Sequence, residues 1–359
     1  MNSLINLKNL KRAEIISDIK KTAEDFQSLN FMEVCGTHTM QIYRAGIPSI
    51  LPSNINLLSG PGCPVCVTPE EFIDKAIAYL KEGYEILTFG DLYRVPGTYG
   101  SLEKECSGKV KIIYSPSESL EYALNNPDKK FILLAVGFET TAPLFAAVVI
   151  DAKKKGIKNL FLLCALKLIP PVMRYLLDAG ELKIDGFLLP GHVATIIGSE
   201  EFRKVCDDYK KPGVVSGFEP EDILQSIFIL LMLLKHKSRF LETQYRMAVK
   251  KEGNILARRE MEKVFQKTKA KWRGIGEIEN SGLTLKEEFI EYDISYIHPL
   301  KIESQVFNPR CRCGEVLRGI ISPVDCPLFD NGCSPQTPQG PCMVSSEGAC
   351  AAIYKYGRE

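Results

Sequence analysis

Short apolar runs alternate with amphipathic stretches of roughly ten to fifteen residues between about Ile55 and Leu234. Several of the runs are apolar almost throughout, which is typical of strands covered on both faces in a parallel sheet. The alternation therefore predicts βαβ units. The predicted strands are Ile55–Ser59, Glu85–Phe89, Lys109–Tyr114, Phe131–Phe138, Leu160–Leu166, Gly186–Leu189 and Gly213–Ser216.

Amphipathic segments follow most of these strands and predict the crossover helices. Two of them open with a start signal, in Thr68-Pro69-Glu70-Glu71 and in Pro220-Glu221-Asp222. Proline is tolerated in the first turn because the N–H groups there have no acceptor within the helix. Acidic side chains in that turn are stabilised by the positive end of the helix dipole. The predicted helices are Pro69–Lys81, Ser117–Asn125, Ala142–Lys155, Pro170–Ala179 and Pro220–Leu234.

Changes in composition along the chain predict three domains. The interval 93–108 is rich in Gly, Ser and charge, and we interpret it as separating two α/β units. After Lys235 the sequence predicts a long charged helical region over about 245–269, followed by irregular sequence to the end. The predicted bounds are 30–115 for a first α/β domain, 116–235 for a second, and 236–359 for a third, to which a helix in 1–29 can be added.

Composition excludes several classes of function. A chain of 359 residues is too long for a single core. Its 45% of hydrophobic residues is enough to form the cores of two or three domains. A net charge of +1 gives no global field for nucleic acid or an anionic membrane. The N-terminus lacks a signal-peptide pattern, and the longest apolar stretch, Ile227–Leu234, is less than half of the ~20 residues that a membrane span needs. We expect a cytoplasmic protein with neither kind of partner.

Twelve cysteines in a cytoplasmic chain favour metal binding or redox chemistry, because cytosolic thiols stay reduced. Four of them, Cys326, Cys333, Cys342 and Cys350, lie within twenty-five residues rich in Pro and Gly. Four thiolates on long loops suit a [4Fe–4S] cluster. Zinc is the weaker assignment because the set has no closely spaced pair, and free or disulfide-bonded thiols are the third. Cys311 and Cys313 could compete for a ligand position, but we interpret them as packing thiols near the cluster.

A second sulfur site is predicted in the N-terminal half. Cys63 and Cys66 form a C-x-x-C between a predicted strand and a helix start, where the helix dipole stabilises a thiolate. The spacing is typical of a reversible dithiol, and half of a zinc site is the alternative. Cys35 and His38 follow another apparent strand, where an exposed thiol beside an imidazole is a candidate metal ligand or nucleophile. For Cys35 alone, a buried apolar role is the alternative.

Two further loops follow apolar strands, at Gly137–Pro143 and Leu189–Val193. Open parallel sheets place their sites at the carboxyl ends of strands, so Glu139, Thr140 and His192 are candidates to line a cleft. Helix capping is the alternative for Thr140. No Walker A loop or G-x-G-x-x-G fingerprint supports a nucleotide site.

Six motifs together resemble the HypD family of [NiFe]-hydrogenase maturation factors over nearly the whole length. They are CGTHTM at Cys35–Met40, GPGCPVCVTP at Gly60–Pro69, GFETTAP at Gly137–Pro143, PGHV at Pro190–Val193, GFEP at Gly217–Pro220, and the ending CPLF…GPCMVSSEGACAA. The resemblance implies an α/β fold with two parallel-sheet, Rossmann-like domains around a cleft and a loop-rich C-terminal iron–sulfur domain.

The resemblance also implies a function and its residues. The family assembles the Fe(CN)2CO unit of the hydrogenase in complex with the small chaperone HypC, receives cyanide from HypE, and acts indirectly on the hydrogenase large subunit. Cys35 would share the Fe(II) with a HypC cysteine, and Cys63 and Cys66 would form a redox-active pair at the same iron site as His38. The [4Fe–4S] cluster would be held by Cys326, Cys333, Cys342 and Cys350.

A function of another class uses the same residues. A stand-alone iron–sulfur-dependent protein disulfide reductase would have Cys63 attack and Cys66 resolve, and would not need Cys35 and His38. A zinc-stabilised binding protein is a third interpretation, which a colourless sample without iron would support.

Overall fold

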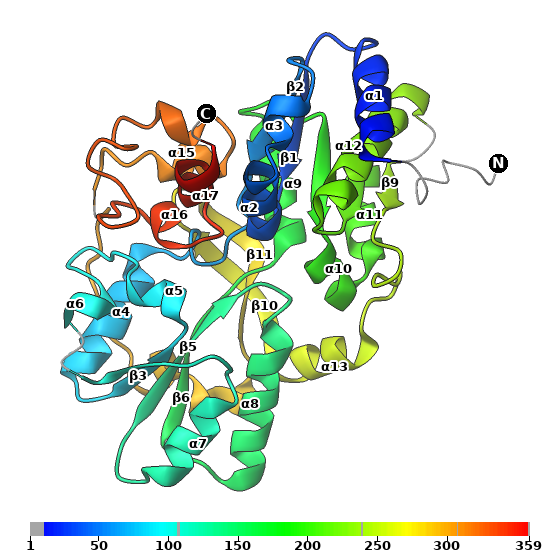
Figure 1. Cartoon of the computed structure of the whole chain (residues 1–359). Coiled ribbons are helices and arrows are strands. Elements are labelled where there is room, and N and C mark those ends of the chain that lie inside the picture. The colour runs from blue at the N-terminus through cyan, green and yellow to red at the C-terminus, as the bar shows by residue number, and fades with distance from the viewer. Residues whose placement is uncertain (1–10, 106–107, 238–239, 307, 358–359) are drawn as a thin grey trace.

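The computed structural model describes residues 11–105, 108–237, 240–306 and 308–357. Its strands form a five-stranded sheet, a four-stranded sheet and a hairpin (Figure 1). All strand pairs within the two larger sheets are parallel. The predicted α/β class with two parallel sheets is confirmed, and every predicted strand is present with its ends within two residues of the expected ones.

The five-stranded sheet has the order β2-β1-β7-β8-β9. One face is covered by α1 (Arg12–Ala23) and α12 (Pro220–His236), which pack together, and the other by α9 (Ile169–Ala179), α10 (Gly191–Ile197) and α11 (Ser199–Tyr209). The strands are β1 (Leu29–Glu33), β2 (Ile55–Ser59), β7 (Gly186–Pro190), β8 (Gly213–Ser216) and β9 (Leu241–Thr243).

The four-stranded sheet has the order β4-β3-β5-β6. Its two faces bury separate apolar cores, one under α4 (Glu70–Lys81), α5 (Gly90–Tyr93) and α6 (Leu102–Glu105), the other under α7 (Glu118–Asn125) and α8 (Ala142–Lys155). The fully buried strand β5 fits this double cover, since all seven of its residues are apolar or glycine. The strands are β3 (Glu85–Thr88), β4 (Val110–Ile112), β5 (Phe131–Gly137) and β6 (Leu160–Leu166).

Strand pairing does not follow the predicted residue blocks. Both sheets take strands from 30–115 and from 116–235, because β1 pairs with β7 and β3 pairs with β5. The interval 93–108 connects β3 and β4, which pair with each other, so it is not a boundary between units. Helix α1 belongs to the core of the five-stranded sheet rather than to the C-terminal part.

The predicted long helix over 245–269 is wrong. Helix α13 covers only Ile255–Val264, and the next residues form β10 (Phe265–Trp272), which pairs antiparallel with β11 (Gly276–Leu285). In β10 the lysines are exposed while Phe265 and Trp272 are buried, so the segment gains more from a half-buried strand than from a helix. The hairpin then leads into η2 (Glu287–Tyr292) and α14 (Ile294–Ile297).

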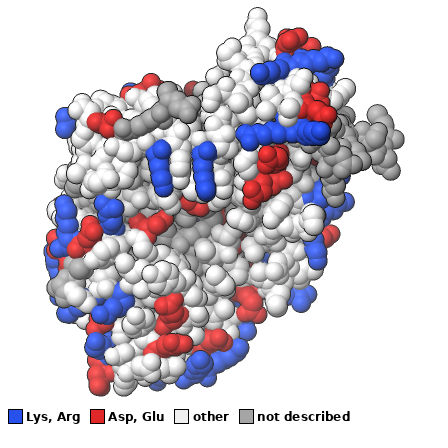
Figure 2. Space-filling view, viewed as in Figure 1, with Lys and Arg blue, Asp and Glu red and all other residues white. Residues whose placement is uncertain are grey.

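The C-terminal cysteine-rich segment lies beside the start of the chain's first βα unit (Figure 1). It holds α15 (Cys313–Leu317), η3 (Pro323–Asp325), α16 (Pro341–Val344) and α17 (Ala349–Tyr356), and α17 packs against α2 (Gly36–Arg44), which α3 (Ile47–Ile50) follows. Acidic and basic side chains are interspersed on the face drawn in Figure 2. Among the helices of the described residues, none is long and apolar enough to cross a bilayer.

Candidate functional site

A cavity of about 420 Å³ lies where the carboxyl ends of the two parallel sheets meet. We call it the cysteine cavity. The five-stranded sheet contributes the loops after β1, β2 and β7, and the four-stranded sheet contributes those after β3 and β5. Crevices outside the carboxyl ends of parallel strands are where α/β folds place their ligands. Its polar and sulfur lining includes Cys35, Cys63, Asp91, Thr140, His192 and Glu347.

The two cysteine-bearing loops of this cavity touch through their backbones. Cys35 directly precedes α2, and the N–H of Gly36 donates to the carbonyl of Gly62 at 2.9 Å. A Cβ at Gly62 would clash with the backbone of Cys35, so only glycine lets the loops approach this closely. The predicted proximity of Cys35 and Cys63 is therefore present in the structure, although the residues belong to different strands' loops.

Cys35 is a buried thiol whose backbone is hydrogen-bonded to a buried acid, Glu33. Its burial raises the pKa of the thiol to about 12, against the opposing effect of the N–H groups of His38 and Thr37. Its own N–H donates to Glu33 at 2.9 Å, and the Thr39 hydroxyl donates to the other carboxylate oxygen of Glu33. Burial raises the pKa of Glu33 to about 8. Without a metal, both groups therefore favour their protonated forms at neutral pH.

The raised pKa of Glu33 predicts a pH-dependent stability. The unfolded carboxyl has a pKa near 4.5 and the folded one about 8, so the folded state binds more protons between these values. The free energy of unfolding should then fall with rising pH across this window, by up to ~1.4 kcal/mol per pH unit. Glu33→Gln should flatten the decline in chemical unfolding between pH ~5 and ~8. Exposed Glu24→Gln is the matched control; equal slopes in wild type and Glu33→Gln would contradict the assignment.

Cys66 lies behind Cys63, away from the cavity. The N–H of Cys66 donates to Cys63 Sγ at 3.2 Å, and both side chains are almost fully buried, with 3% exposure for Cys63 and none for Cys66. Burial raises the pKa of Cys66 well above its usual value, as do Cys63, Cys350 and Glu347. Cys66 is thus near both the cavity and a C-terminal cysteine. The thiol that was expected to be exposed, Cys35, is itself buried.

The C-terminal cysteines converge on one apolar pocket, which we call the sulfur pocket. It is lined by Val316, Phe329, Gly340, Met343 and by six cysteines, Cys311, Cys313, Cys326, Cys333, Cys342 and Cys350. The Sγ atoms of Cys313 and Cys342 lie next to each other as a close pair. The other four cysteines are free. Burial raises the pKa of the Cys350 thiol, and the nearby thiols of Cys311, Cys333 and Cys326 raise it further.

The close pairing of Cys342 with Cys313 makes Cys311 a second candidate for the fourth ligand position. The sequence favoured Cys342 as a ligand and Cys311 as a packing thiol, whereas the structure engages Cys342 with Cys313 and leaves Cys311 facing the three remaining sulfurs. Chain spacing could not show this, because the chain returns Cys311 and Cys313 to the pocket that the cysteines from 326 onward also line. All four predicted ligands, Cys326, Cys333, Cys342 and Cys350, line this one pocket together with Cys311 and Cys313.

The sulfur pocket suits a thiolate-ligated cluster in its donor chemistry. The N–H of Gln339 donates to Cys333 Sγ at 3.4 Å, and a Cβ at Gly340 would come within 2.7 Å of Cys311 Sγ. Close backbone and N–H···S contacts are the means by which proteins surround iron–sulfur clusters. Within the described part of the chain, no three His, Cys, Asp or Glu side chains are arranged around a single metal ion. The fit therefore depends on sulfur content and lining.

Acidic residues near Cys35 were missed at the sequence level. The Thr37 hydroxyl donates to Glu347 at 2.7 Å, and the Ser345 hydroxyl donates to Asp91 at 3.0 Å. Burial raises the pKa of Glu347, Thr37 lowers it and Asp91 raises it. A Cβ at Gly36 would lie 2.6 Å from Glu347 Cβ, so this acid sits directly on the start of α2. Only its place beside Cys350 in the sequence hinted at a role.

The two histidines occupy different positions. His38 is fully buried and does not line the cavity; its Nε2–H donates to the carbonyl of Gly217 at 2.9 Å, while Nδ1 has no hydrogen-bond partner among the described residues. Burial lowers the pKa of His38 to about 4, so the ring is neutral. His192 is exposed at the cavity and stacks on Phe218 at 3.8 Å between ring centroids, with His38 stacked on the same ring at 4.8 Å.

The loop after β5 divides its residues between two cavities. Thr140 lines the cysteine cavity, as the sequence suggested, together with Phe138. Glu139 does not: it lines a separate cavity on the other side of the loop. Of the three cleft candidates, Thr140 and His192 are therefore brought to the cysteines.

Comparison with known proteins decides the family. A family model described as "HypD: Hydrogenase formation hypA family" matches residues 11–357. The chain belongs to the HypD family. It is 44% identical to a putative hydrogenase expression/formation protein of Methanocaldococcus jannaschii, with 96% of each chain covered. It is 41% identical to the hydrogenase maturation factor HypD of Azotobacter vinelandii, with 96% of this chain and 94% of the relative covered.

The relative from Escherichia coli K12, also named hydrogenase maturation factor HypD, is 41% identical, with 96% and 93% of the two chains covered. Hydrogenase maturation is the role of this family member. The cysteine cavity and the sulfur pocket are the places in the described fold where such a role would find its chemistry.

Proposed function

We propose that this chain is the scaffold on which the Fe(CN)2CO unit of a [NiFe]-hydrogenase is assembled, with a HypC-type chaperone as partner and a HypE-type protein as cyanide donor. The observation that carries the proposal is the cysteine cavity, where Cys35 and Cys63 meet between the two sheets. A small open space of about 420 Å³ can admit an iron ion with diatomic ligands and one cysteine of a partner. The large subunit would then receive the finished unit indirectly.

The charges around Cys35 suit a cation as cargo. Glu347 and Asp91 line the cavity, and the negative charge of Glu347 raises the pKa of the Cys35 thiol. The same charge disfavours a bare thiolate and favours Fe(II), because the cation compensates both groups. Iron binding at Cys35 would therefore release the thiol proton. His192, the exposed imidazole of the cavity, is the candidate second residue to contact the cargo.

A [4Fe–4S] cluster held by Cys311, Cys326, Cys333 and Cys350 would be the resident cofactor. When bound, it would supply single electrons close to the site. Cys66 interacts electrostatically with Cys350 as well as with Cys63, so the C-x-x-C pair lies between the sulfur pocket and the cysteine cavity. The buried Arg273 faces Cys311 and Cys66 and donates to Glu70 at 2.9 Å, which places one guanidinium charge beside both sulfur sites.

The alternative of a stand-alone disulfide reductase fits the geometry less well. A protein disulfide must reach the attacking sulfur within bonding distance, and Cys63 and Cys66 are almost fully buried. Of the two, only Cys63 lines the cavity, where small groups rather than a folded substrate can reach it. No other observation in the described structure favours that function.

Infrared spectroscopy with metal analysis tests the proposal. The chain is co-produced with its HypC-type and HypE-type partners and isolated without oxygen. The complex should retain iron beyond that of the cluster and show cyanide and carbon monoxide stretching bands, while the chain isolated alone should show neither. A stable, cluster-loaded complex without these bands would contradict the scaffold role.

A further inference from the structure

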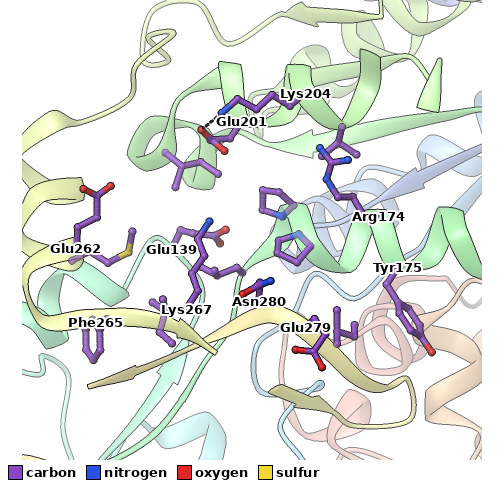
Figure 3. Close-up of a pocket in the computed structure, with 18 of the residues that line it drawn as sticks. Glu139, Arg174, Tyr175, Glu201, Lys204, Glu262, Phe265, Lys267, Glu279 and Asn280 are labelled. Atoms are coloured by element: carbon purple, nitrogen blue, oxygen red, sulfur yellow. Dashed lines mark hydrogen bonds and ion pairs between the residues drawn. The ribbon is translucent and has the colours of Figure 1, made fainter. Parts of the chain in front are cut away.

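A second cavity of about 570 Å³ lies on the opposite side of the loop after β5. We call it the Glu139 cavity. It is bounded by α9, α11, α13 and the β10–β11 hairpin, and none of its lining residues belongs to the cysteine cavity. Figure 3 shows Lys267 and Asn280 close to Glu139, and Lys204 paired with Glu201 on another wall of the cavity. The proposed assembly of the iron unit does not use this cavity.

Glu139 is the one buried acid that faces the cavity without a complete set of partners. Its side chain is 1% exposed; Oε1 accepts the N–H of Ile169 at 2.9 Å, and Oε2 has no hydrogen-bond partner in the described structure. A buried polar atom without a partner is destabilising unless a ligand or water satisfies it. The free oxygen therefore marks a position where a bound molecule would gain a hydrogen bond.

Two more polar side chains reach the same space. Lys267 of β10 passes over Glu139, and Asn280 of β11 lies beside both (Figure 3). Asn280 has a left-handed backbone with φ of 54°, which turns its side chain out of the regular strand pattern. Within the described residues, no ion pair engages Lys267 and no hydrogen bond engages the Asn280 amide. Glu139, Lys267 and Asn280 therefore all reach the cavity with polar groups that are available to bind a ligand.

Other charges on the cavity wall are already compensated. Arg174 pairs with Asp208 at 2.7 Å, and Lys204 pairs with Glu201 at 2.8 Å. Arg258 faces Glu262 at 3.9 Å, Glu279 faces Lys269 at 3.6 Å, and the Tyr209 hydroxyl donates to Asp178 at 2.6 Å. Among the described residues, Lys267 is therefore the one lysine or arginine of the wall without an ion pair. Burial raises the pKa of Glu139 to about 7, so near neutral pH its carboxyl can carry a proton and donate it in a hydrogen bond. Leu168, Pro170 and Ile278 give the remaining wall an apolar character.

We propose that the Glu139 cavity binds a small organic monoanion, a carboxylate attached to an apolar body. The carboxylate would accept hydrogen bonds from Lys267, the Asn280 amide and the protonated Glu139 carboxyl, and the apolar body would lie against the leucine and proline wall. Glu139 lies in the loop after β5, and the residues on either side of it, Phe138 and Thr140, line the cysteine cavity. The two sites therefore share one loop and can be occupied together.

Three isosteric probes of different charge test this proposal: benzoate, benzamide and benzylamine, titrated calorimetrically into the purified full chain near neutral pH. Benzoate should bind at least tenfold more tightly than benzamide, and benzylamine should bind least. A ligand efficiency of about 0.3 kcal/mol per non-hydrogen atom puts the weakest acceptable Kd for benzoate at ~10 mM. Weaker benzoate binding, or preference for benzylamine, would overturn the proposal.

Variants locate the binding site. Lys267→Met should weaken benzoate about tenfold, whereas Lys263→Met, which removes an exposed lysine of α13 outside the cavity, should not change the Kd. Glu139→Leu should also weaken binding about tenfold, and Glu139→Gln should restore most of it because an amide N–H can donate in place of the carboxyl. Equal losses in Lys267→Met and Lys263→Met would overturn the assignment, and circular dichroism establishes that each variant is folded.

Discussion

Cys311→Ser is expected to abolish the [4Fe–4S] cluster, whereas Cys342→Ser should leave it in place. In the structure Cys342 is paired with Cys313, while Cys311 joins Cys326, Cys333 and Cys350 around the sulfur pocket. A cubane cluster takes four thiolates, and serine is a poor replacement for one of them. Protein isolated without oxygen should contain about four irons per chain in the wild type and in Cys342→Ser, and close to none in Cys311→Ser.

Cys313→Ser is the matched control for this pair, because it removes the sulfur that lies next to Cys342. It should behave as Cys342→Ser does, with a retained cluster spectrum and, at most, lower stability. The reverse pattern, with iron lost in Cys342→Ser and kept in Cys311→Ser, would restore the ligand set that the sequence favoured. Visible absorption and iron and sulfide analysis distinguish the two outcomes.

The strands could be predicted because their signal is local. Phe131–Gly137 is apolar throughout and follows the polar run Asp128-Lys129-Lys130, so its position follows from burial on both faces. Which strands pair is not a local property. The partnership of β1 with β7 joins residues about 155 positions apart, as the hydrogen bond from Asn30 to Asp185 shows, and nothing in either strand specifies it. The predicted domain blocks followed chain order for this reason.

The cysteine cavity was predictable in part. Cys35, Cys63, Thr140 and His192 each follow a parallel strand, and the carboxyl ends of such strands share an edge. Glu347 reaches the cavity from a segment 310 residues after its partner Thr37, with no periodicity to mark it. His38 was expected at the site on spacing alone, but three residues into α2 its side chain turns into the core. Helical geometry, not proximity in sequence, decides which side chain faces the cavity.

Loss of the iron–cyanide unit is the expected result of Cys35→Ala. Cys35 is the cavity thiol that the Gly36 and Gly62 backbones fix in place, and Glu347 and Asp91 supply the negative surroundings that favour Fe(II) over a proton. Alanine removes the sulfur with little change of volume, so the cluster and the fold should persist. In the complex with its partners, the cyanide and carbon monoxide bands should disappear and the iron content should fall to that of the cluster.

Cys206→Ala provides the control for that loss, since Cys206 is an equally buried thiol on α11 that lines neither the cysteine cavity nor the sulfur pocket. It should retain the infrared bands at wild-type intensity. If Cys35→Ala also kept them, the iron would have to be held elsewhere, and Cys63 would be the next ligand to test because it is the other thiol of the cavity. If both alanine variants lost the bands, the loss would reflect damage to the buried core rather than removal of a ligand. Cys206 does not line the cavity, so its replacement can affect the iron unit only by disturbing the packing of the protein.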